Sequence, residues 1–197
     1  KKAESKVPDK LIVGTNAEFP PFEYMNDKKQ PEGFDIAMIK EIGKRMGKKV
    51  EIKNMEFKSL IGAMESDSIN AIIAGMTKTE KREKAVDFSD SYYTTNQAII
   101  LKKDSKITKL AQLDGKKIGV QEGTTGDLIS SGDKFGDGKK AKVLVKGAKV
   151  KRFKKGVDAV MDLKNGSVDA VVIDELTANE FVKKNAKKLK IVIDSAG

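Results

Sequence analysis

Arg82 ends a stretch of sequence that could bind an anion. This stretch is Ser68–Arg82, with the sequence SINAIIAGMTKTEKR. Its apolar run predicts a short buried strand, and Gly75 predicts a turn after it. Thr77 and Glu80 have the spacing of a capping box, which predicts the start of a helix. A helix N-terminus offers free N–H groups, and a planar guanidinium suits a carboxylate. Because capping boxes are common, the stretch alone favours an ordinary helix start with Arg82 on the surface.

Other predicted loops carry complementary groups. The turn Gly123–Gly126 lacks the lysine of a phosphate-binding loop, so it is either a simple turn or a source of N–H and hydroxyl donors for the same anion. Asp174 ends an apolar strand, where its carboxylate could hold an ammonium group, although capping the next helix is the simpler interpretation in isolation. Four loops follow predicted strands: Gly14–Phe22, Ala74–Arg82, Gln121–Asp127 and Ile173–Leu176.

An anion site and a carboxylate on facing loops match the two charges of a free amino acid. The rings of Phe19, on a loop stiffened by Pro20 and Pro21, and of Phe57 would then form walls for its side chain. Core packing is the alternative for both rings.

The composition excludes several other chemistries. The chain has 197 residues, of which 39% are hydrophobic and 35% charged, with no cysteine and no histidine. Thiol chemistry, histidine triads and histidine zinc sites are therefore excluded, and no apolar run has the length of a membrane span. The net charge of +10 comes from scattered lysine pairs that alternate with acids. Solvated surface lysine is the favoured interpretation over nucleic-acid or membrane binding.

The elements that position these loops alternate between strands and helices. Asp35 is predicted as the N-cap of the first helix, and short apolar runs predict parallel strands. The segments SINAIIAG, at 68–75, and SVDAVVID, at 167–174, repeat one pattern. We therefore expect an α/β fold with two similar lobes and a cleft lined by the carboxyl ends of both sets of strands. The predicted ranges are a flexible leader at 1–10, lobe 1 at 11–93, lobe 2 at 94–192 and, at 193–197, a return to lobe 1; 134–142 is predicted as a surface loop.

Six motifs, in this order, resemble the polar amino-acid-binding proteins of ABC importers, which are extracellular solute-binding proteins of the two-lobed periplasmic type II. The resemblance covers Leu11–Gly197 and rests on GTNAEFPPFEY, GFDIAMIKEIGKRMG, AIIAGMTKTEKR, VDFSDSYY, IGVQEGTTG and NGSVDAVVIDELTANEFV. It implies mostly parallel central sheets joined by a two-segment hinge, near 91–97 and 190–195. The family adds a strand and a C-terminal helix after this point, and we expect both to be missing here.

The resemblance also implies roles for individual residues. Arg82 would bind the α-carboxylate and Asp174 the α-ammonium group. The remaining expected contacts come from both lobes: Asn16, Glu18, Phe19, Phe57, Gly75, Met76, Thr77, Gln121, Glu122 and Thr125. The position of Asn16 is often aspartate in members that bind cationic amino acids, so Glu18 and Glu122 would have to replace that charge. Lysine, arginine or histidine is the favoured class of ligand, and a neutral ligand such as glutamine or cystine is the alternative.

The implied function is a transport receptor that captures an amino acid and delivers it to a membrane permease. We expect no cofactor, no metal and no nucleic acid, a monomer, and a location in the periplasm or at the outer face of the cell membrane, either free or lipid-anchored after removal of a signal peptide. A dehydratase-like enzyme with Glu18 or Glu122 as general acid/base is the alternative from another class. A basic nucleic-acid binder is the third.

Overall fold

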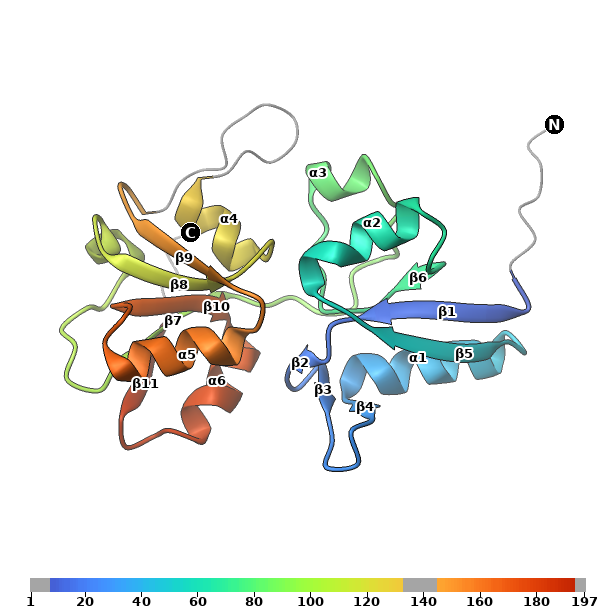
Figure 1. The fold of residues 1–197 in the computed structure, drawn as a ribbon, viewed down its shortest axis with the longest axis horizontal. Coiled ribbons are helices and arrows are strands. Elements are labelled where there is room, and N and C mark those ends of the chain that lie inside the picture. Colours follow the sequence, from blue (N-terminus) through green and yellow to red (C-terminus); the bar gives the residue numbers. More distant parts are fainter. Residues whose placement is uncertain (1–7, 133–144, 194–197) are drawn as a thin grey trace.

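The computed structural model describes residues 8–132 and 145–193, and the predictions made for 1–7, 134–142 and 194–197 lie outside these residues. The chain folds into two lobes side by side, connected by the segment that leads from α3 (Glu80–Glu83) to β7 (Gln97–Lys102) (Figure 1). The strand β1 (Lys10–Thr15) begins at Lys10, which is the last residue of the predicted leader and lies one residue before the predicted start of lobe 1.

Lobe 1 is built on a small parallel sheet in the order β5-β1-β6. The helix α1 (Phe34–Arg45) connects β1 to β5 (Lys49–Asn54), and a 3-10 turn, η1 (Phe57–Ser59), leads into α2 (Leu60–Glu65) and then β6 (Ala71–Ile72). A second, antiparallel sheet of short strands follows β1: β2 (Glu18–Phe19), β3 (Glu23–Met25) and β4 (Pro31–Glu32).

Lobe 2 has a five-stranded sheet in the order β11-β7-β10-β8-β9. The strands β10 (Ala170–Asp174), β8 (Lys117–Gln121) and β9 (Lys149–Phe153) are parallel, whereas β7 and β11 (Leu189–Ile193) are antiparallel to their neighbours, so this sheet is mixed. The helices are the 3-10 turn η2 (Leu110–Leu113), α4 (Thr125–Ser131), α5 (Gly156–Asn165) and α6 (Glu175–Lys183).

Each lobe contains a βαβαβ unit, which confirms the two lobes of similar build that the repeated sequence pattern predicted. In each, the first strand lies between the second and the third, giving β5-β1-β6 and β9-β8-β10. The third residue of the repeat, which is Asn70 in lobe 1 and Asp169 in lobe 2, makes the same hydrogen bonds in both lobes. Asn70 exchanges two hydrogen bonds with the backbone of Ile12, at 2.8 and 2.9 Å. Asp169 does so with Lys117, also at 2.8 and 2.9 Å. The repeat therefore ties its strand to the first strand of the unit.

Apolar residues at strand and helix spacing form the core of each lobe. In lobe 2 the sheet is buried between two clusters that include Ile100 with Leu163 on one face and Leu101 with Ile118 on the other. Phe19 and Phe22 of lobe 1 are part of the first of these clusters. The two lobes therefore share apolar packing at their junction.

Two predicted helix caps in lobe 1 are wrong. The N-cap of α1 is Gly33, and Asp35 is a fully buried residue in the first turn, whose carboxylate accepts hydrogen bonds from distant groups. The helix α3 begins two residues later than predicted, with Thr79 as its N-cap, and the Thr79 hydroxyl accepts a hydrogen bond from the N–H of Arg82. Thr77 lies outside the helix, so the predicted Thr77–Glu80 capping box does not form.

Candidate ligand-binding site between the lobes

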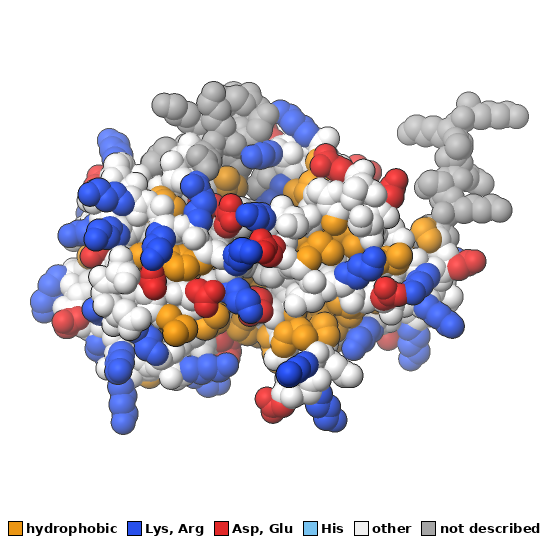
Figure 2. Space-filling view, in the orientation of Figure 1, with side chains coloured by type: hydrophobic (Ala, Val, Ile, Leu, Met, Phe, Trp, Pro, Cys, Tyr) orange, Lys and Arg blue, Asp and Glu red, His pale blue; other side chains and the backbone are white. Residues whose placement is uncertain are grey.

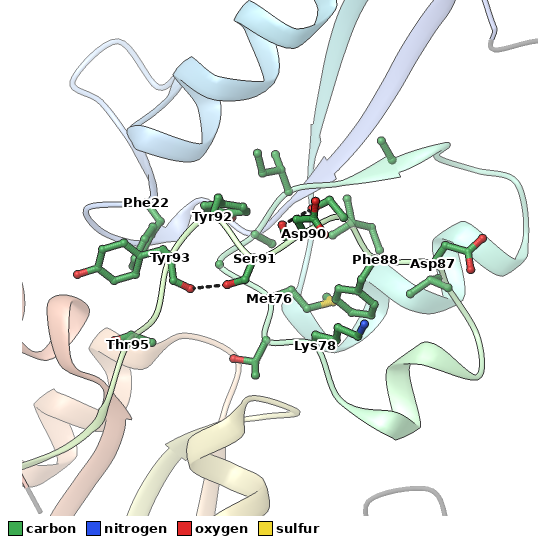
Figure 3. A pocket seen from close by; sticks show the side chains of 18 of the residues that line it. Phe22, Met76, Lys78, Asp87, Phe88, Asp90, Ser91, Tyr92, Tyr93 and Thr95 are labelled. Carbon is green, nitrogen blue, oxygen red and sulfur yellow. Dashed lines mark hydrogen bonds between the residues drawn. The ribbon is translucent and has the colours of Figure 1, made fainter. Parts of the chain in front are cut away.

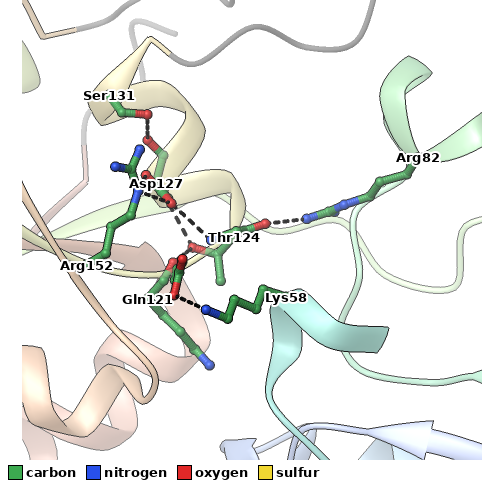
Figure 4. A network of polar contacts seen from close by, with 9 residues as sticks. Lys58, Arg82, Gln121, Thr124, Asp127, Ser131 and Arg152 are labelled. Carbon is green, nitrogen blue, oxygen red and sulfur yellow. Dashed lines mark hydrogen bonds and ion pairs between the residues drawn. The ribbon is translucent and has the colours of Figure 1, made fainter. Parts of the chain in front are cut away.

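Arg82 crosses from lobe 1 to lobe 2. Its side chain is buried, at 6% relative exposure, and its guanidinium donates at 2.6 Å to the carbonyl of Thr77. It also donates at 3.0 Å to the carbonyl of Gly123 in lobe 2 (Figure 4). The guanidinium also lies 5.3 Å from the ring centre of Phe57, within the range of a cation–π contact. Burial lowers the pKa of Arg82 to about 10, and the charge of Asp174 opposes this shift. Arg82 therefore stays cationic at neutral pH.

Asp174 supplies the opposite charge at the end of β10. It is 7% exposed, and the side chain of Gln97 on β7 donates a hydrogen bond to its carboxylate. It occupies the N-cap position of α6, as predicted, but its side chain makes no capping hydrogen bond. Burial raises the pKa of Asp174 to about 7, and the charge of Arg82 opposes the shift. The carboxyl thus bonds to Gln97 and does not cap its own helix.

Among the residues that the structure describes, neither Arg82 nor Asp174 forms a salt bridge. Each is a desolvated charge whose direct contacts are neutral amides or carbonyls. Buried charges of opposite sign are most stable when each has a charged partner with good geometry. A zwitterion would supply a carboxylate to one and an ammonium group to the other.

Asn16 and Gln121 connect the lobes beside these charges. The amide of Gln121 donates to Asn16 Oδ1 at 2.7 Å, and the amide of Asn16 donates to the carbonyl of Met55 at 2.9 Å. Both residues are almost fully buried: Gln121 is 1% exposed and Asn16 is 4% exposed. Gln121 Oε1 has no hydrogen-bond partner among the described residues. This amide pair has one free acceptor and is suited to contact a polar group.

The loop before α4 faces Arg82. Thr124 is the N-cap of α4, and its hydroxyl accepts a hydrogen bond from the N–H of Asp127. The carboxylate of Asp127 in turn accepts a hydrogen bond from the N–H of Gly123 at 2.9 Å and forms an ion pair with Arg152 (Figure 4). These contacts hold the carbonyl of Gly123 where Arg82 reaches it. Thr125, the predicted carboxylate contact, is the first residue of α4 and is partly buried.

A groove of about 710 Å³ opens beside the site, between β6 and the segment 86–95 (Figure 3). Four predicted site residues line it: Gly75, Met76, Thr77 and Asp174. Met76 also packs against a lobe 1 core cluster, whereas Thr77 is exposed. Phe19 is 7% exposed and belongs to the shared core, so its ring is a core residue that also borders Gly75.

Ion pairs between lysines and acids form a rim along the junction. Lys155 pairs with Glu18 at 2.8 Å, Lys58 with Glu122 at 2.9 Å, and Lys154 with Glu56 at 2.7 Å. Each pair joins one lobe to the other, and Figure 2 shows charges of both signs side by side along the middle of the molecule. The two glutamates predicted to accept a cationic ligand side chain thus already have lysine partners.

Comparison with known proteins identifies the family. The model of the bacterial extracellular solute-binding proteins, family 3, matches residues 11–196. The chain belongs to this family. Its described helices include none that is long and apolar enough to cross a membrane.

Individual proteins are also similar to nearly all of the chain. The arginine-binding extracellular protein ArtP of Bacillus subtilis is 37% identical over 189 residues, which are 95% of this chain and 69% of ArtP. The arginine-bound form of truncated ArgBP from T. maritima is 41% identical with a TM-score of 0.81, covering 94% of this chain and 82% of that one. An ancestral arginine-binding protein bound to arginine is 43% identical with a TM-score of 0.84, covering 94% and 79%. An ancestral arginine-binding protein bound to glutamine is also 43% identical, with a TM-score of 0.81, covering 94% and 79%.

Sequence reasoning missed several residues around this family 3 site. Gln97, the three rim lysines and Glu56 were not singled out, and neither were Glu23 or Tyr92, which are described below. The rim lysines resemble all the other scattered lysines, so their pairing depends on the meeting of the lobes. Glu23 had one usable signal, because an acid that directly follows the Phe19–Phe22 apolar loop is placed to be buried.

Proposed function

We propose that this chain is the amino-acid-binding component of an ABC importer and that it binds the backbone of a free L-amino acid between its lobes. The observation that supports this is the pair of buried, oppositely charged groups Arg82 and Asp174, each without a salt bridge in the described residues. Arg82 would bind the α-carboxylate, with Thr77 and Thr125, and Asp174 would bind the α-ammonium group with the carbonyl of Gly75. Membership of family 3 supports the same role.

The remaining predicted residues would surround the ligand side chain. The ring of Phe57, which contacts Arg82, and the amides of Asn16 and Gln121 would form one side of this pocket, and Phe19 and Met76 would close the apolar side. The proposed lobes are residues 11–93 and 94–192, with lobe closure around 91–97. Movement of the lobes would exchange the rim ion pairs for contacts with solvent.

We infer a basic L-amino acid, arginine first, as the ligand. The names of ArtP and of the T. maritima protein support this class. For arginine to bind through its guanidinium, Glu18 or Glu122 would exchange its lysine partner for the ligand. A neutral polar ligand is the second candidate, because Asn16 and Gln121 offer amides and an ancestral arginine-binding protein has a structure bound to glutamine.

The receptor would act without catalysis and deliver its ligand to a membrane permease. The chain has neither histidine nor cysteine, and its relatives are binding proteins, which supports binding over a dehydratase-like reaction. Family 3 proteins are extracellular, so we propose an extracytoplasmic monomer, free or lipid-anchored after removal of a signal peptide.

Titration calorimetry with a panel of L-amino acids tests this function. We expect arginine to bind and Arg82→Ala to weaken that binding at least about 100-fold, because a bidentate charged contact is lost. Arg45→Ala is the matched control, since Arg45 lies on the exposed face of α1 and pairs with Glu41. An unchanged affinity in Arg82→Ala would exclude Arg82 from the site, and the absence of any bound amino acid would exclude the function.

A further inference from the structure

Glu23 is a fully buried acid that the binding site described above does not use. It is the first residue of β3 and is 0% exposed, and neither of its carboxyl oxygens has a hydrogen-bond donor among the described residues. One of these oxygens lies 3.8 Å from the position that a Cβ would occupy on Gly75. An ionised carboxylate without a partner is very costly in such a place.

The neighbouring groups are also acids. The charges that act on Glu23 come from Asp35 on α1 and from Asp174 at the end of β10, and the phenol of Tyr92 also belongs to the cluster. The positive charge of Arg82 acts on Asp174. Burial, the charge of Asp35 and a hydrogen bond with Asp35 raise the pKa of Glu23 well above its usual range, and Asp174 adds to this.

Asp35 differs from Glu23 because donors surround it. Its carboxylate accepts the N–H of Gly75 at 2.7 Å and the hydroxyl of Tyr92 at 2.9 and 3.0 Å. It also lies in the first turn of α1, where the helix dipole favours a negative charge. Burial and the charge of Asp35 raise the pKa of Tyr92, so the phenol keeps its proton. Both carboxylate oxygens of Asp35 therefore have hydrogen-bond donors, whereas those of Glu23 have none among the described residues.

Through these bonds Asp35 contacts two functional segments, and Glu23 lies beside the first of them, at Gly75. Gly75 has a positive φ of 51° and lines the groove beside Met76 and Thr77. Tyr92 belongs to the segment that connects the lobes, and its backbone follows the same groove (Figure 3). A second negative charge at Glu23 would repel Asp35 and disturb both segments at once.

We propose that Glu23 is protonated at neutral pH and shares this proton with Asp35, and that the pair positions the Gly75 loop and the connecting segment for ligand binding. Glu23 is thus a positioning residue whose charge state is coupled to the shape of the site. The claim about ligand binding rests on the proposed function, whereas the claim about the proton does not.

The first test follows folding without ligand. Between the pKa of Glu23 in the unfolded chain and its raised pKa in the folded one, the folded protein holds one more proton, so its stability falls as the pH rises. Glu23→Gln keeps a neutral donor and cannot lose a proton. We expect urea unfolding to show that the ratio of the folding constant of Glu23→Gln to that of the wild type rises about tenfold or more from pH 5 to pH 9. Asp174 titrates in both proteins and cancels in the comparison.

The control is Glu65→Gln, on the exposed end of α2, for which the difference from the wild type should not change with pH. Parallel pH curves for Glu23→Gln and the wild type would overturn the shared proton.

The second test uses L-arginine as the probe in calorimetry. At pH 7 we expect Glu23→Gln to bind within about threefold of the wild type and Glu23→Leu, which lacks the donor, to bind at least about tenfold more weakly. Equal affinity in Glu23→Leu and the wild type, or equal losses in both variants, would overturn the positioning role. If no variant and no wild-type protein binds an amino acid, the proposed function fails and the unfolding curves still decide the proton.

Discussion

At the scale of single residues, Asp174 favours binding at the expense of folding. Its carboxyl is buried, its pKa is raised to about 7, and its direct contact is the neutral amide of Gln97. Functional sites commonly hold such groups, because a ligand supplies the charge that the fold leaves out. The same logic applies to Arg82, whose guanidinium contacts two carbonyls.

Replacing Asp174 should therefore separate stability from binding. The pKa of Asp174 is higher in the folded protein than in the unfolded chain, so ionisation of this carboxyl destabilises the fold. The wild type therefore loses stability relative to Asp174→Asn as the pH rises from about 4 to about 7. We expect Asp174→Asn to be more stable by about 1–3 kcal/mol at pH 8 and to be about equal at pH 4, while losing amino-acid binding. Thermal unfolding at both pH values measures this. Asp104→Asn, on the surface, is the control, and a destabilised Asp174→Asn at pH 8 would contradict the argument.

Individual roles were harder to predict from sequence than their positions. The residues Arg82 and Asp174 stood out because they follow strands, but the helix cap fell on Thr79 instead of Thr77. Asp35 looked like a cap, yet it accepts bonds from Gly75 and Tyr92, which lie 40 and 57 residues away. Local patterns contain no information on such distant donors, so this part of the site needed the structure.

At the scale of elements, apolar runs predicted the βαβαβ unit of lobe 1 and the strands β8 and β10 of the lobe 2 unit, because the central strands are buried on both faces. The edge strand β9 was not predicted, since KVKRF has three basic residues out of five and mostly exposed side chains. The strands β2 and β4, of two residues each, are too short to have a pattern. Burial thus decides which elements a sequence reveals.

The helix α4 depends on a close approach to β10. A Cβ on Gly126 would lie 2.5 Å from the carbonyl oxygen of Val172, which is backbone and cannot rotate away. We expect Gly126→Ala to destabilise the protein by about 1–3 kcal/mol and to weaken ligand binding, because α4 must shift away from the strand that ends at Asp174. Urea unfolding measures the first effect and calorimetry the second.

Gly62 provides the matched control for this substitution. It lies in α2, and a Cβ there would meet nothing within 4 Å, so Gly62→Ala should be neutral or stabilising by up to about 1 kcal/mol. Similar behaviour of the two alanine variants would show that the contact with Val172 does not constrain α4.

At the scale of the whole molecule, the three rim ion pairs should favour the closed arrangement of the lobes. Exposed pairs contribute about 0.2–1 kcal/mol each and are screened by salt. We expect the radius of gyration of the ligand-free protein, measured by small-angle X-ray scattering, to increase between about 20 and 500 mM salt, where the Debye length falls from roughly 20 to 4 Å. The triple variant with Lys58→Gln, Lys154→Gln and Lys155→Gln should already have a larger radius of gyration than the wild type at low salt.

A variant of equal charge serves as the control for this measurement. Lys40→Gln, Lys103→Gln, Lys106→Gln removes three exposed lysines away from the junction, so its radius should follow that of the wild type. The same radius for all three proteins at every salt concentration would mean that the rim pairs do not hold the lobes together.

The position of Phe19 and Phe22 has a thermodynamic consequence. Both rings come from lobe 1 but are buried in a cluster with lobe 2 residues such as Ile100 and Leu163. Separating the lobes would hydrate them, and hydrated apolar surface raises the heat capacity. Ligand binding to a protein that is already closed should therefore show a small heat-capacity change, and binding to an open one a large negative change. In a chain without tryptophan, calorimetry at several temperatures can thus report the resting conformation without any added probe.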